Sequence, residues 1–300
     1  MVCVDRMKTF FHITLLFLFT AGLRAGDIAM PVLIGHRGDQ ELGLQNTLSA
    51  FRGAWQNNIR GVELDVRQTK DGKLICFHDA DFSKLAGDKR KVSNLTYDEI
   101  KKIDISRFKH PMFKDEHPPL LEEVFAEMPK SSSLYIEIKG NSVSKDFPYQ
   151  LRDLMKKYSV AKEQITVVSF EEEVLRNLNS KTPGIHNMWV VGLRCCRDLG
   201  MGKGDDITKV EDKLIAKLKD IGCTGVSFAA GDTRIKFDKR FTDKLKKSGL
   251  KYSFWLINDL WQLRKLAELG AETVLTDRPV SMQYAWEKRF GKGSAHRSGK

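Results

Sequence analysis

The stretch Gly61-Val-Glu-Leu-Asp-Val-Arg-Gln-Thr-Lys-Asp-Gly-Lys-Leu-Ile-Cys-Phe-His-Asp79 joins a strand-like apolar run, through a polar turn, to a second short run. Glu63 and Asp65 lie two residues apart, so on a strand both carboxylates face the same side, while a leucine and a valine face the other. Carboxylates on the inner face of an apolar strand are costly unless they are paired or bind a cation. The stretch therefore predicts a buried strand whose two carboxylates are paired or bind a cation.

The turn in this stretch also predicts where a histidine lies. The Asp-Gly dipeptide at 71–72 is typical of a two-residue hairpin turn. With that turn, Lys70 would lie opposite Lys73, and counting back along both strands would place Asp65 opposite His78. The hairpin therefore predicts a histidine beside the carboxylates, in a register that a slip of one residue would undo.

The rest of the chain repeats short apolar runs separated by amphipathic ones. The expected strands are 32–36, 62–69, 134–138, 165–170, 188–191, 226–228, 252–257 and 273–275. The expected helices are 46–57, 119–128, 147–157, 171–179, 209–221, 238–247 and 259–269. Eight strands in this rhythm indicate an α/β protein with a parallel (β/α)8 TIM barrel, spanning about residues 26–290, rather than an open sheet.

Residues 81–118 break the rhythm. This segment is polar, has no good strand pattern, carries a weak helix pattern at 97–103 and ends in His117-Pro118-Pro119. We interpret it as a small insertion after the second strand. Inserted barrel loops often cover the mouth of the active site and select substrates.

The N-terminus resembles a targeting segment. Arg6 and Lys8 precede an apolar run over residues 9–23, and small alanines follow near its end. This order is typical of a secretory signal peptide over residues 1–25, so we expect a mature chain that starts near Gly26 and is secreted or periplasmic. An uncleaved membrane anchor is the alternative.

The bulk composition is that of a soluble globular protein, with 41% hydrophobic and 30% charged residues. The net charge of +11 is compatible with weak contact to an anionic membrane surface. The basic runs are short, scattered and not interleaved with aromatic residues, which argues against nucleic-acid binding. The Gly/Lys/Ser-rich end, residues 291–300, is expected to be a disordered basic tail. The sequence does not indicate an oligomeric state.

Four cysteines remain beyond the signal segment: Cys76, Cys195, Cys196 and Cys223. The adjacent pair Cys195-Cys196 lacks the spacing of a zinc site. An extracytoplasmic location permits disulfides, but we expect buried or free thiols.

Further polar residues are expected at the ends of neighbouring barrel strands. His36 ends the first strand, in Ile34-Gly-His-Arg-Gly38, and Glu137 and Lys139 share one face in Tyr135-Ile-Glu-Ile-Lys139. The carboxyl ends of barrel strands carry the active site, so these residues should meet the carboxylates and the histidine of the hairpin. Singly, each has an ordinary structural explanation. Together, on successive strands, they predict one site.

The residue types suit phosphate chemistry. Three carboxylates supply hard oxygen ligands for Mg²⁺ or Ca²⁺. Two histidines, His36 and His78, can share general acid and base catalysis near neutral pH. Arg37 and Lys139 can bind a phosphate.

In sequence order, these motifs resemble the glycerophosphodiester phosphodiesterase family. The matching motifs are His36-Arg37-Gly38, Gln45-Asn46-Thr47, Glu63-Leu-Asp65, the Thr-Lys-Asp-Gly turn, His78-Asp79, Ile136-Glu-Ile-Lys139, the strand of Trp255 with Asn258, and Thr276-Asp-Arg-Pro279. The resemblance covers about residues 32–280. It implies a TIM barrel with a small insertion after the second strand.

The resemblance also implies roles for single residues. The acid/base pair falls on His36 and His78. One divalent cation, Mg²⁺ or Ca²⁺, falls on Glu63, Asp65 and Glu137, and the phosphate contacts fall on Arg37 and Lys139.

One residue departs from the family pattern, because Gln45 stands where the family usually has Glu. Glutamine keeps the size and the hydrogen bonding but loses the charge. If the family residue only braces the first loop, Gln45 should suffice. If its charge tunes a histidine or supports the metal, activity should be reduced.

The expected function is metal-dependent hydrolysis of small-molecule glycerophosphodiesters to glycerol phosphate and an alcohol. We expect Trp255, and less strongly Phe170, on the apolar wall of the pocket. One alternative is a lysophospholipase D or a phosphoinositide-type phospholipase, which an apolar insertion would favour; this insertion is largely polar. The other is a non-catalytic binding barrel, which a missing ligand or histidine would favour; none is missing.

Overall fold

The computed structural model describes residues 28–106, 113, 116–231 and 235–291. The expected signal segment at 1–25 and nearly all of the expected tail at 291–300 lie outside these residues. Within them, Cys76, Cys195, Cys196 and Cys223 form no disulfide, as expected. None of the described helices is long and apolar enough to cross a lipid bilayer.

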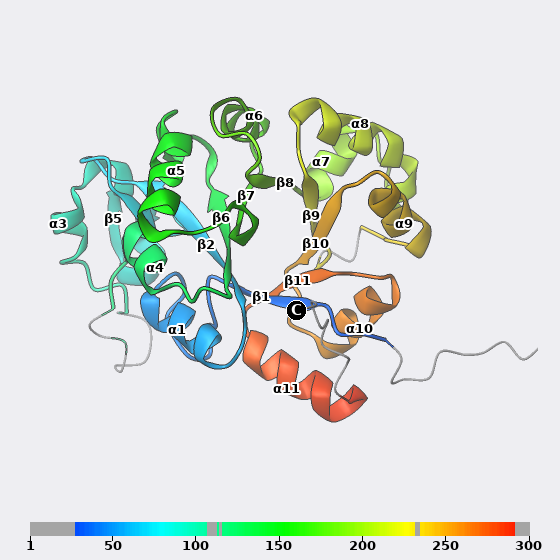
Figure 1. Ribbon diagram of the computed structural model, residues 1–300, viewed down its shortest axis with the longest axis horizontal. Helices are drawn as coiled ribbons and strands as arrows, with labels where there is room; N and C mark the ends of the chain where they lie inside the picture. The colour runs from blue at the N-terminus through cyan, green and yellow to red at the C-terminus, as the bar shows by residue number, and fades with distance from the viewer. Residues whose placement is uncertain (1–27, 107–112, 114–115, 232–234, 292–300) are drawn as a thin grey trace, which may run out of the picture.

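Eight parallel strands close into a barrel at the centre of the molecule (Figure 1). They are β1 (Val32–His36), β2 (Gly61–Gln68), β6 (Ser133–Ile138), β7 (Ile165–Ser169), β8 (His186–Val191), β9 (Gly225–Ala229), β10 (Lys251–Trp255) and β11 (Thr273–Thr276). The first strand, β1, pairs with both β2 and β11, which closes the ring. The predicted TIM barrel is confirmed, and each expected strand range overlaps one of these strands.

The helices surround the barrel strands in Figure 1. They are α1 (Leu48–Gln56), α4 (Leu121–Glu127), α5 (Phe147–Tyr158), α6 (Glu172–Lys181), α7 (Leu193–Asp198), α8 (Glu211–Ile221), α9 (Lys239–Lys247), α10 (Leu260–Glu268) and α11 (Pro279–Phe290). The short α7 and the final α11 were not predicted. Helix α11 starts with a proline, which suits a first helical turn, and buries Met282 and Trp286.

The barrel core is apolar on both sides of the strands. Outward-facing residues of β2 and β6, such as Leu64, Val66 and Ile136, are completely buried with residues of the surrounding helices. Strands β7 and β9 are buried along their whole length. Strands covered on both faces read as continuous apolar runs, which is why the sequence pattern located them.

The hairpin register predicted from the sequence is wrong by one residue. Strand β3 (Leu74–Cys76) pairs antiparallel with β2 so that Val66 lies opposite Cys76, which places Phe77 rather than His78 opposite Asp65. The loop has three residues, closed by a hydrogen bond from Thr69 N to Lys73 O of 2.9 Å, and Gly72 adopts a φ of 78° in it. A three-residue loop with a left-handed glycine shifts the register.

The segment after β3 forms a small structure of its own. It contains β4 (Asp81–Phe82), α2 (Ser83–Ala86), β5 (Asp88–Lys91), the 3₁₀ turn Val92–Asn94 and α3 (Tyr97–Ile100). The expectation of no strand in this segment is wrong, because β4 and β5 pair antiparallel. Phe82 and Ile100 are buried in a separate apolar cluster with Phe77. This segment lies at one edge of the molecule (Figure 1).

Candidate active site

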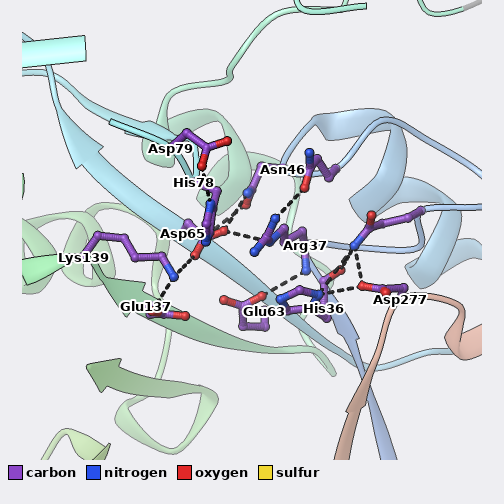
Figure 2. Close-up of polar contacts among 12 residues, drawn as sticks. His36, Arg37, Asn46, Glu63, Asp65, His78, Asp79, Glu137, Lys139 and Asp277 are labelled. Carbon is purple, nitrogen blue, oxygen red and sulfur yellow. Dashed lines mark hydrogen bonds and ion pairs between the residues drawn. The ribbon is translucent and has the colours of Figure 1, made fainter. Parts of the chain in front are cut away.

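Three carboxylates meet at the carboxyl ends of β2 and β6. In the strand ladder His36 lies beside Glu63, and Asp65 lies beside Glu137, so all four side chains are set by register. Each carboxylate offers an oxygen within 4.8 Å of the others. The exposed fractions of Glu63, Asp65 and Glu137 are only 1%, 0% and 9%. The predicted convergence of the three carboxylates is thus present (Figure 2).

Two basic side chains partly balance this acidic cluster. Lys139 Nζ lies 3.0 Å from Asp65 Oδ1 and 2.5 Å from Glu137 Oε1. Arg37 Nε lies 3.1 Å from Asp65 Oδ2. The two cations balance Asp65 and Glu137 but leave Glu63 without an ion pair in the described structure. Glu63 Oε1 is buried there and has no hydrogen-bond partner. A buried carboxylate oxygen without a partner is costly unless a proton or a cation offsets its charge.

The pKa values of the three carboxyl groups reflect this imbalance. Burial raises the pKa of Glu63 well above its ordinary value, and the charges of Asp65 and Glu137 raise it further. Burial, with the charge of Asp65, raises the pKa of Glu137 to about 7. Burial alone would raise the pKa of Asp65, but Lys139 and Arg37 outweigh it and lower the value to about 2. The cluster therefore favours one further positive charge, either a proton or a metal cation.

Arg37 is held at the start of the loop after β1. Its backbone is left-handed, with a φ of 58°, and its backbone N donates to Glu63 Oε2 at 3.0 Å. Its Nη1 donates to Gln45 Oε1 at 2.6 Å. The glutamine that departs from the family pattern thus orients Arg37, and an amide oxygen is sufficient for this hydrogen bond.

Asn46 is a site residue to which sequence analysis assigned no role. Its Nδ2 donates to Asp65 Oδ2 at 2.8 Å, and its Oδ1 accepts from Asp65 N at 3.0 Å. Asn46 is buried and adopts a φ of 59°, a conformation that asparagine tolerates better than most residues. The only signal was its place in the Gln45-Asn46-Thr47 motif.

His36 forms a pair with Asp277, a second residue that the sequence did not assign. His36 Nδ1 lies 2.7 Å from Asp277 Oδ1. Gln40 Nε2 donates to the same oxygen at 2.6 Å, and Asn258 Nδ2 donates to the other at 2.6 Å. Burial alone would raise the pKa of Asp277, but the hydrogen bond and charge of His36 help to lower it. This network engages Nδ1 of His36 and leaves Nε2 available.

His78 follows the hairpin and reaches the same site despite the shifted register. Its Nδ1 lies 3.0 Å from Asp79 Oδ1, which also accepts from Lys84 Nζ at 2.7 Å. Its carbonyl oxygen accepts from Arg67 Nε at 2.8 Å, which fixes the backbone beyond the end of β3. Burial lowers the pKa of His78, partly offset by the charge of Asp65.

One cavity of about 250 Å³ joins these groups. Its polar wall is lined by His36, Arg37, Glu63, His78, Glu137 and Lys139. Its opposite wall is lined mainly by apolar side chains, namely Val168, Phe170, Val190, Trp255 and Leu275. Trp255 and Phe170, both expected from the sequence to line the pocket, lie on this wall with their rings edge to face at 5.9 Å.

Comparison with known proteins identifies the family. A sequence model of the glycerophosphoryl diester phosphodiesterase family matches residues 36–281, which is most of the chain. The chain belongs to this family. It is therefore a phosphodiesterase, and the enzyme class predicted from the sequence is confirmed.

Similar proteins share the family and the fold. A glycerophosphodiester phosphodiesterase of Caldanaerobacter subterraneus subsp. tengcongensis is 26% identical over 84% of this chain and 96% of its own. A human lysophospholipase D is 27% identical over 83% of this chain and 84% of its own. A solved phosphodiesterase of Oleispira antarctica, in complex with the product sn-glycerol-3-phosphate, has a TM-score of 0.72 at 23% identity and covers 86% of this chain and 97% of its own.

Proposed function

We propose that this phosphodiesterase hydrolyses glycerophosphodiesters to glycerol phosphate and an alcohol, with one bound divalent cation and two histidines that transfer protons. The observation that carries the proposal is the polar wall of the cavity. Two histidines, His36 and His78, two basic side chains and the carboxylates of Glu63 and Glu137 line one space. The third buried carboxylate, Asp65, offers an oxygen within 4.8 Å of the other two. This set of groups is sufficient for cleavage of a phosphodiester.

The cation, Mg²⁺ or Ca²⁺, would be held by Glu63, Asp65 and Glu137. The residues fit this role, because the set consists of hard oxygen donors and Glu63 Oε1 is buried without a partner. When bound, such a cation neutralises phosphate charge and lowers the pKa of an attacking hydroxyl.

The two basic residues would hold the phosphate. Arg37 lines the cavity, and its guanidinium is oriented by Gln45. Lys139 lies beside Asp65 and Glu137 with its ammonium group at the cavity wall. Both cations are therefore placed to offset the negative charge of a phosphodiester beside the carboxylates.

The histidines would transfer the two protons of the reaction. Displacement at phosphorus needs one proton removed from the nucleophile and another supplied to the leaving alcohol. Asp277 holds Nδ1 of His36, and Asp79 holds Nδ1 of His78, which leaves Nε2 of each ring to exchange a proton with substrate. A substrate with an activated leaving group distinguishes the two roles. It should restore turnover to the variant that lacks the general acid, but not to the variant that lacks the general base.

The direct test is activity on glycerophosphocholine with added Mg²⁺, Ca²⁺ or EDTA. We expect release of glycerol phosphate and choline with one of the two cations and loss of activity in EDTA. Full activity in EDTA would contradict the metal requirement. Absence of turnover with either cation would contradict the proposed reaction on this substrate.

A second candidate is a lysophospholipase D, and the apolar wall of the cavity favours it. Phe170 is 40% exposed and stands edge to face with Trp255. An acyl chain could lie along this pair at the cavity wall. Comparing kcat/KM for lysophosphatidylcholine and glycerophosphocholine separates the two candidates, since only the first substrate carries an acyl chain.

We also propose that the protein is exported. The support is the order of basic, apolar and small residues over positions 6–25. N-terminal sequencing of the native protein should find a start near Gly26. A soluble cytosolic species that retains residues 7–20 would contradict export.

A further inference from the structure

A second hollow adjoins the catalytic cavity. This groove, of about 310 Å³, lies between β2, the loop after β6 and the segment that follows β3. Lys139 lines both the groove and the catalytic cavity. A molecule bound with its phosphodiester in the cavity can therefore extend past Lys139 into the groove.

The wall formed by the loop after β6 is fixed to β2. Ser142 Oγ donates to Val66 O at 3.1 Å, and Ser144 N donates to Gln68 Oε1 at 2.8 Å. Gln68 is held in turn, because its Nε2 donates to Gly72 O at 3.1 Å. These hydrogen bonds fix the position of this wall relative to β2.

The opposite wall comes from the segment after β3. Lys91 ends β5, and the next residue, Val92, donates its backbone N to Ala80 O at 3.0 Å. Lys91 also lies opposite Asp81 in the β4–β5 ladder. Lys91 is exposed and has no carboxylate within 4 Å among the described residues. It is thus a free cation on a structured wall.

Arg67 forms the floor of the groove and is also unpaired. It lies on the same face of β2 as Asp65, two residues further on, which corresponds to about 7 Å along the strand. It is half-buried, and its Nε donates to His78 O at 2.8 Å. In the described structure, its Nη atoms have no protein acceptor and no carboxylate lies within 4 Å of it. Arginine is rarely buried without an anionic partner, so a partly buried guanidinium that lacks one is suited to bind an anionic ligand.

The carboxylates that act on Arg67 are engaged elsewhere, and Asp65 is paired with Lys139 and Arg37. Asp79 binds His78 and Lys84, and Asp81 accepts from the backbone and side chain of Ser83. Arg67 and Lys91 therefore present two positive charges, with serine hydroxyls nearby, at the outer end of the catalytic cavity.

We propose that this groove binds a second anionic group, a phosphate or a carboxylate, on the alcohol portion of the substrate. The preferred substrates are then glycerophosphodiesters of acidic alcohols. This inference rests on the proposed function, because it needs the phosphodiester to bind in the adjoining cavity. Arg67, about 7 Å along β2 from Asp65, and Lys91, on the facing wall of the groove, suit an anion attached to the same small molecule.

The test compares two substrates that differ by one phosphate, glycerophosphoinositol 4-phosphate and glycerophosphoinositol. The wild-type enzyme should show a kcat/KM at least about tenfold higher for the phosphorylated substrate, mainly through a lower KM. Lys91→Ala should reduce this preference by about fivefold and leave kcat/KM for glycerophosphoinositol unchanged. Equal kcat/KM for the two substrates in the wild type would overturn the proposal.

Lys89→Ala is the matched control. Lys89 lies on the same strand, β5, but does not line the groove. Its substitution by alanine removes the same charge as Lys91→Ala. It should leave the substrate preference unchanged. If Lys89→Ala lowered the preference as much as Lys91→Ala, the preference would arise from long-range attraction between basic residues and the anionic substrate, and the groove would not be a binding site.

Glycerophosphoserine extends the test to a carboxylate. Lys91→Ala should lower kcat/KM for this substrate but not for glycerophosphocholine, whose alcohol is cationic. A loss with the inositol phosphate alone would restrict the groove to phosphate. An equal loss with glycerophosphocholine would contradict recognition of an anion.

Calorimetry separates the failure of this proposal from failure of the proposed function. If neither inositol compound is turned over, the proposed reaction fails for these substrates, and their binding can still be compared in the presence of Mg²⁺ or Ca²⁺. The phosphorylated compound should bind at least about tenfold more tightly, and Lys91→Ala should reduce the difference. Equal affinities would overturn the groove proposal.

Discussion

The two walls of the catalytic cavity differ in what they contribute to the protein. The polar wall, from β1, β2 and β6, borders a cluster of three buried carboxylates that has two close cations among the described residues, and Glu63 Oε1 has neither a hydrogen bond nor an ion pair there. The apolar wall, from β7, β8, β10 and β11, is made of side chains such as Val168, Val190 and Leu275, which are almost completely buried. The negative charge of the polar wall is incompletely balanced, whereas the apolar wall consists mainly of packed side chains of the barrel core.

This difference indicates a division between activity and stability. Buried charges that lack partners destabilise a fold, and proteins retain them where function requires them. Buried apolar side chains stabilise the fold by removing surface from water. Substitutions on the polar wall should therefore lower turnover with little loss of stability, while substitutions on the apolar wall should do the reverse.

The largest effects are expected for the histidines of the polar wall. His36→Ala and His78→Ala should each lower turnover by at least about 10²-fold and leave the fold intact, because each removes a proton-transfer group. The measurement is turnover across a metal titration, with the unfolding temperature of each variant. His186→Ala is the matched control, since His186 begins β8 at the other end of the barrel. Recovery of near-normal turnover at saturating metal would show that the histidine acts through the metal instead.

The second effect concerns the stability of the acidic cluster without metal. Glu137 has its pKa raised from 4.5 to about 7, so its contribution to stability is fully present below pH 4.5 and is lost as the pH rises through about 7. Glu63 shifts in the same direction. Asp65, with its pKa lowered to about 2, changes the free energy of unfolding only at more acidic pH. In EDTA the free energy of unfolding should fall by about 3 kcal/mol between pH 4.5 and 8.

Thermal unfolding in EDTA and in excess Ca²⁺ or Mg²⁺ measures this effect. The cation should remove most of the loss at pH 8 and change little at pH 4.5, where the carboxyl groups hold protons instead. Glu137→Gln is the control and should reduce the pH dependence in EDTA, leaving the part that comes from Glu63. An unchanged pH dependence in Glu137→Gln would mean that the loss arises elsewhere.

A smaller effect should distinguish the partners of the two histidines. Asp277→Asn should lower kcat by about 10- to 100-fold with little change in KM, because Gln40 and Asn258 hold Asp277 firmly against His36. Asp79→Asn should cost only a few-fold, because Asp79 shares one oxygen between His78 and an exposed lysine. Equal losses in kcat would remove the distinction between the two pairs.

The smallest effect on activity is expected at the apolar wall. Trp255→Ala should raise KM several-fold, change kcat by less than about twofold and destabilise the protein by about 2 kcal/mol. Phe254→Leu is the control, because Phe254 is buried on the outer side of the same strand and should affect stability alone. Unchanged KM in folded Trp255→Ala would place Trp255 in the core and not in substrate binding.

The barrel and much of the site could be predicted from the sequence because the signals are local. Each barrel strand is a short apolar run, and β1 has the predicted bounds, Val32–His36. Parallel strands bring their carboxyl ends together, so Glu63 and Glu137 could be expected to meet without knowledge of the exact register. The exposed strand β5, with its Asp-Lys-Arg-Lys sequence, has no apolar pattern and was therefore missed.

Features that depend on distant contacts could not be predicted. Asp277 lies 241 positions from His36, and nothing in either local sequence indicates the pairing. The hairpin register failed because the dipeptide Asp71-Gly72 does not define the loop length; the left-handed Gly72 closes a loop of three residues. His78 still reaches the site because the chain leaves the β-ladder after Phe77, whose N still donates to Asp65 O at 2.9 Å.

The pairing of the first barrel strand with the last has a consequence for the synthesis of this enzyme. His36 belongs to the earliest strand to be made, while Asp277 follows the final one, so the complete dyad exists only when the ring has closed. A nascent chain that lacks its final segment has His36 without its partner and has an open edge on β1. Contacts this distant in sequence form slowly. Catalytic competence should therefore arise late, as a property of the finished chain.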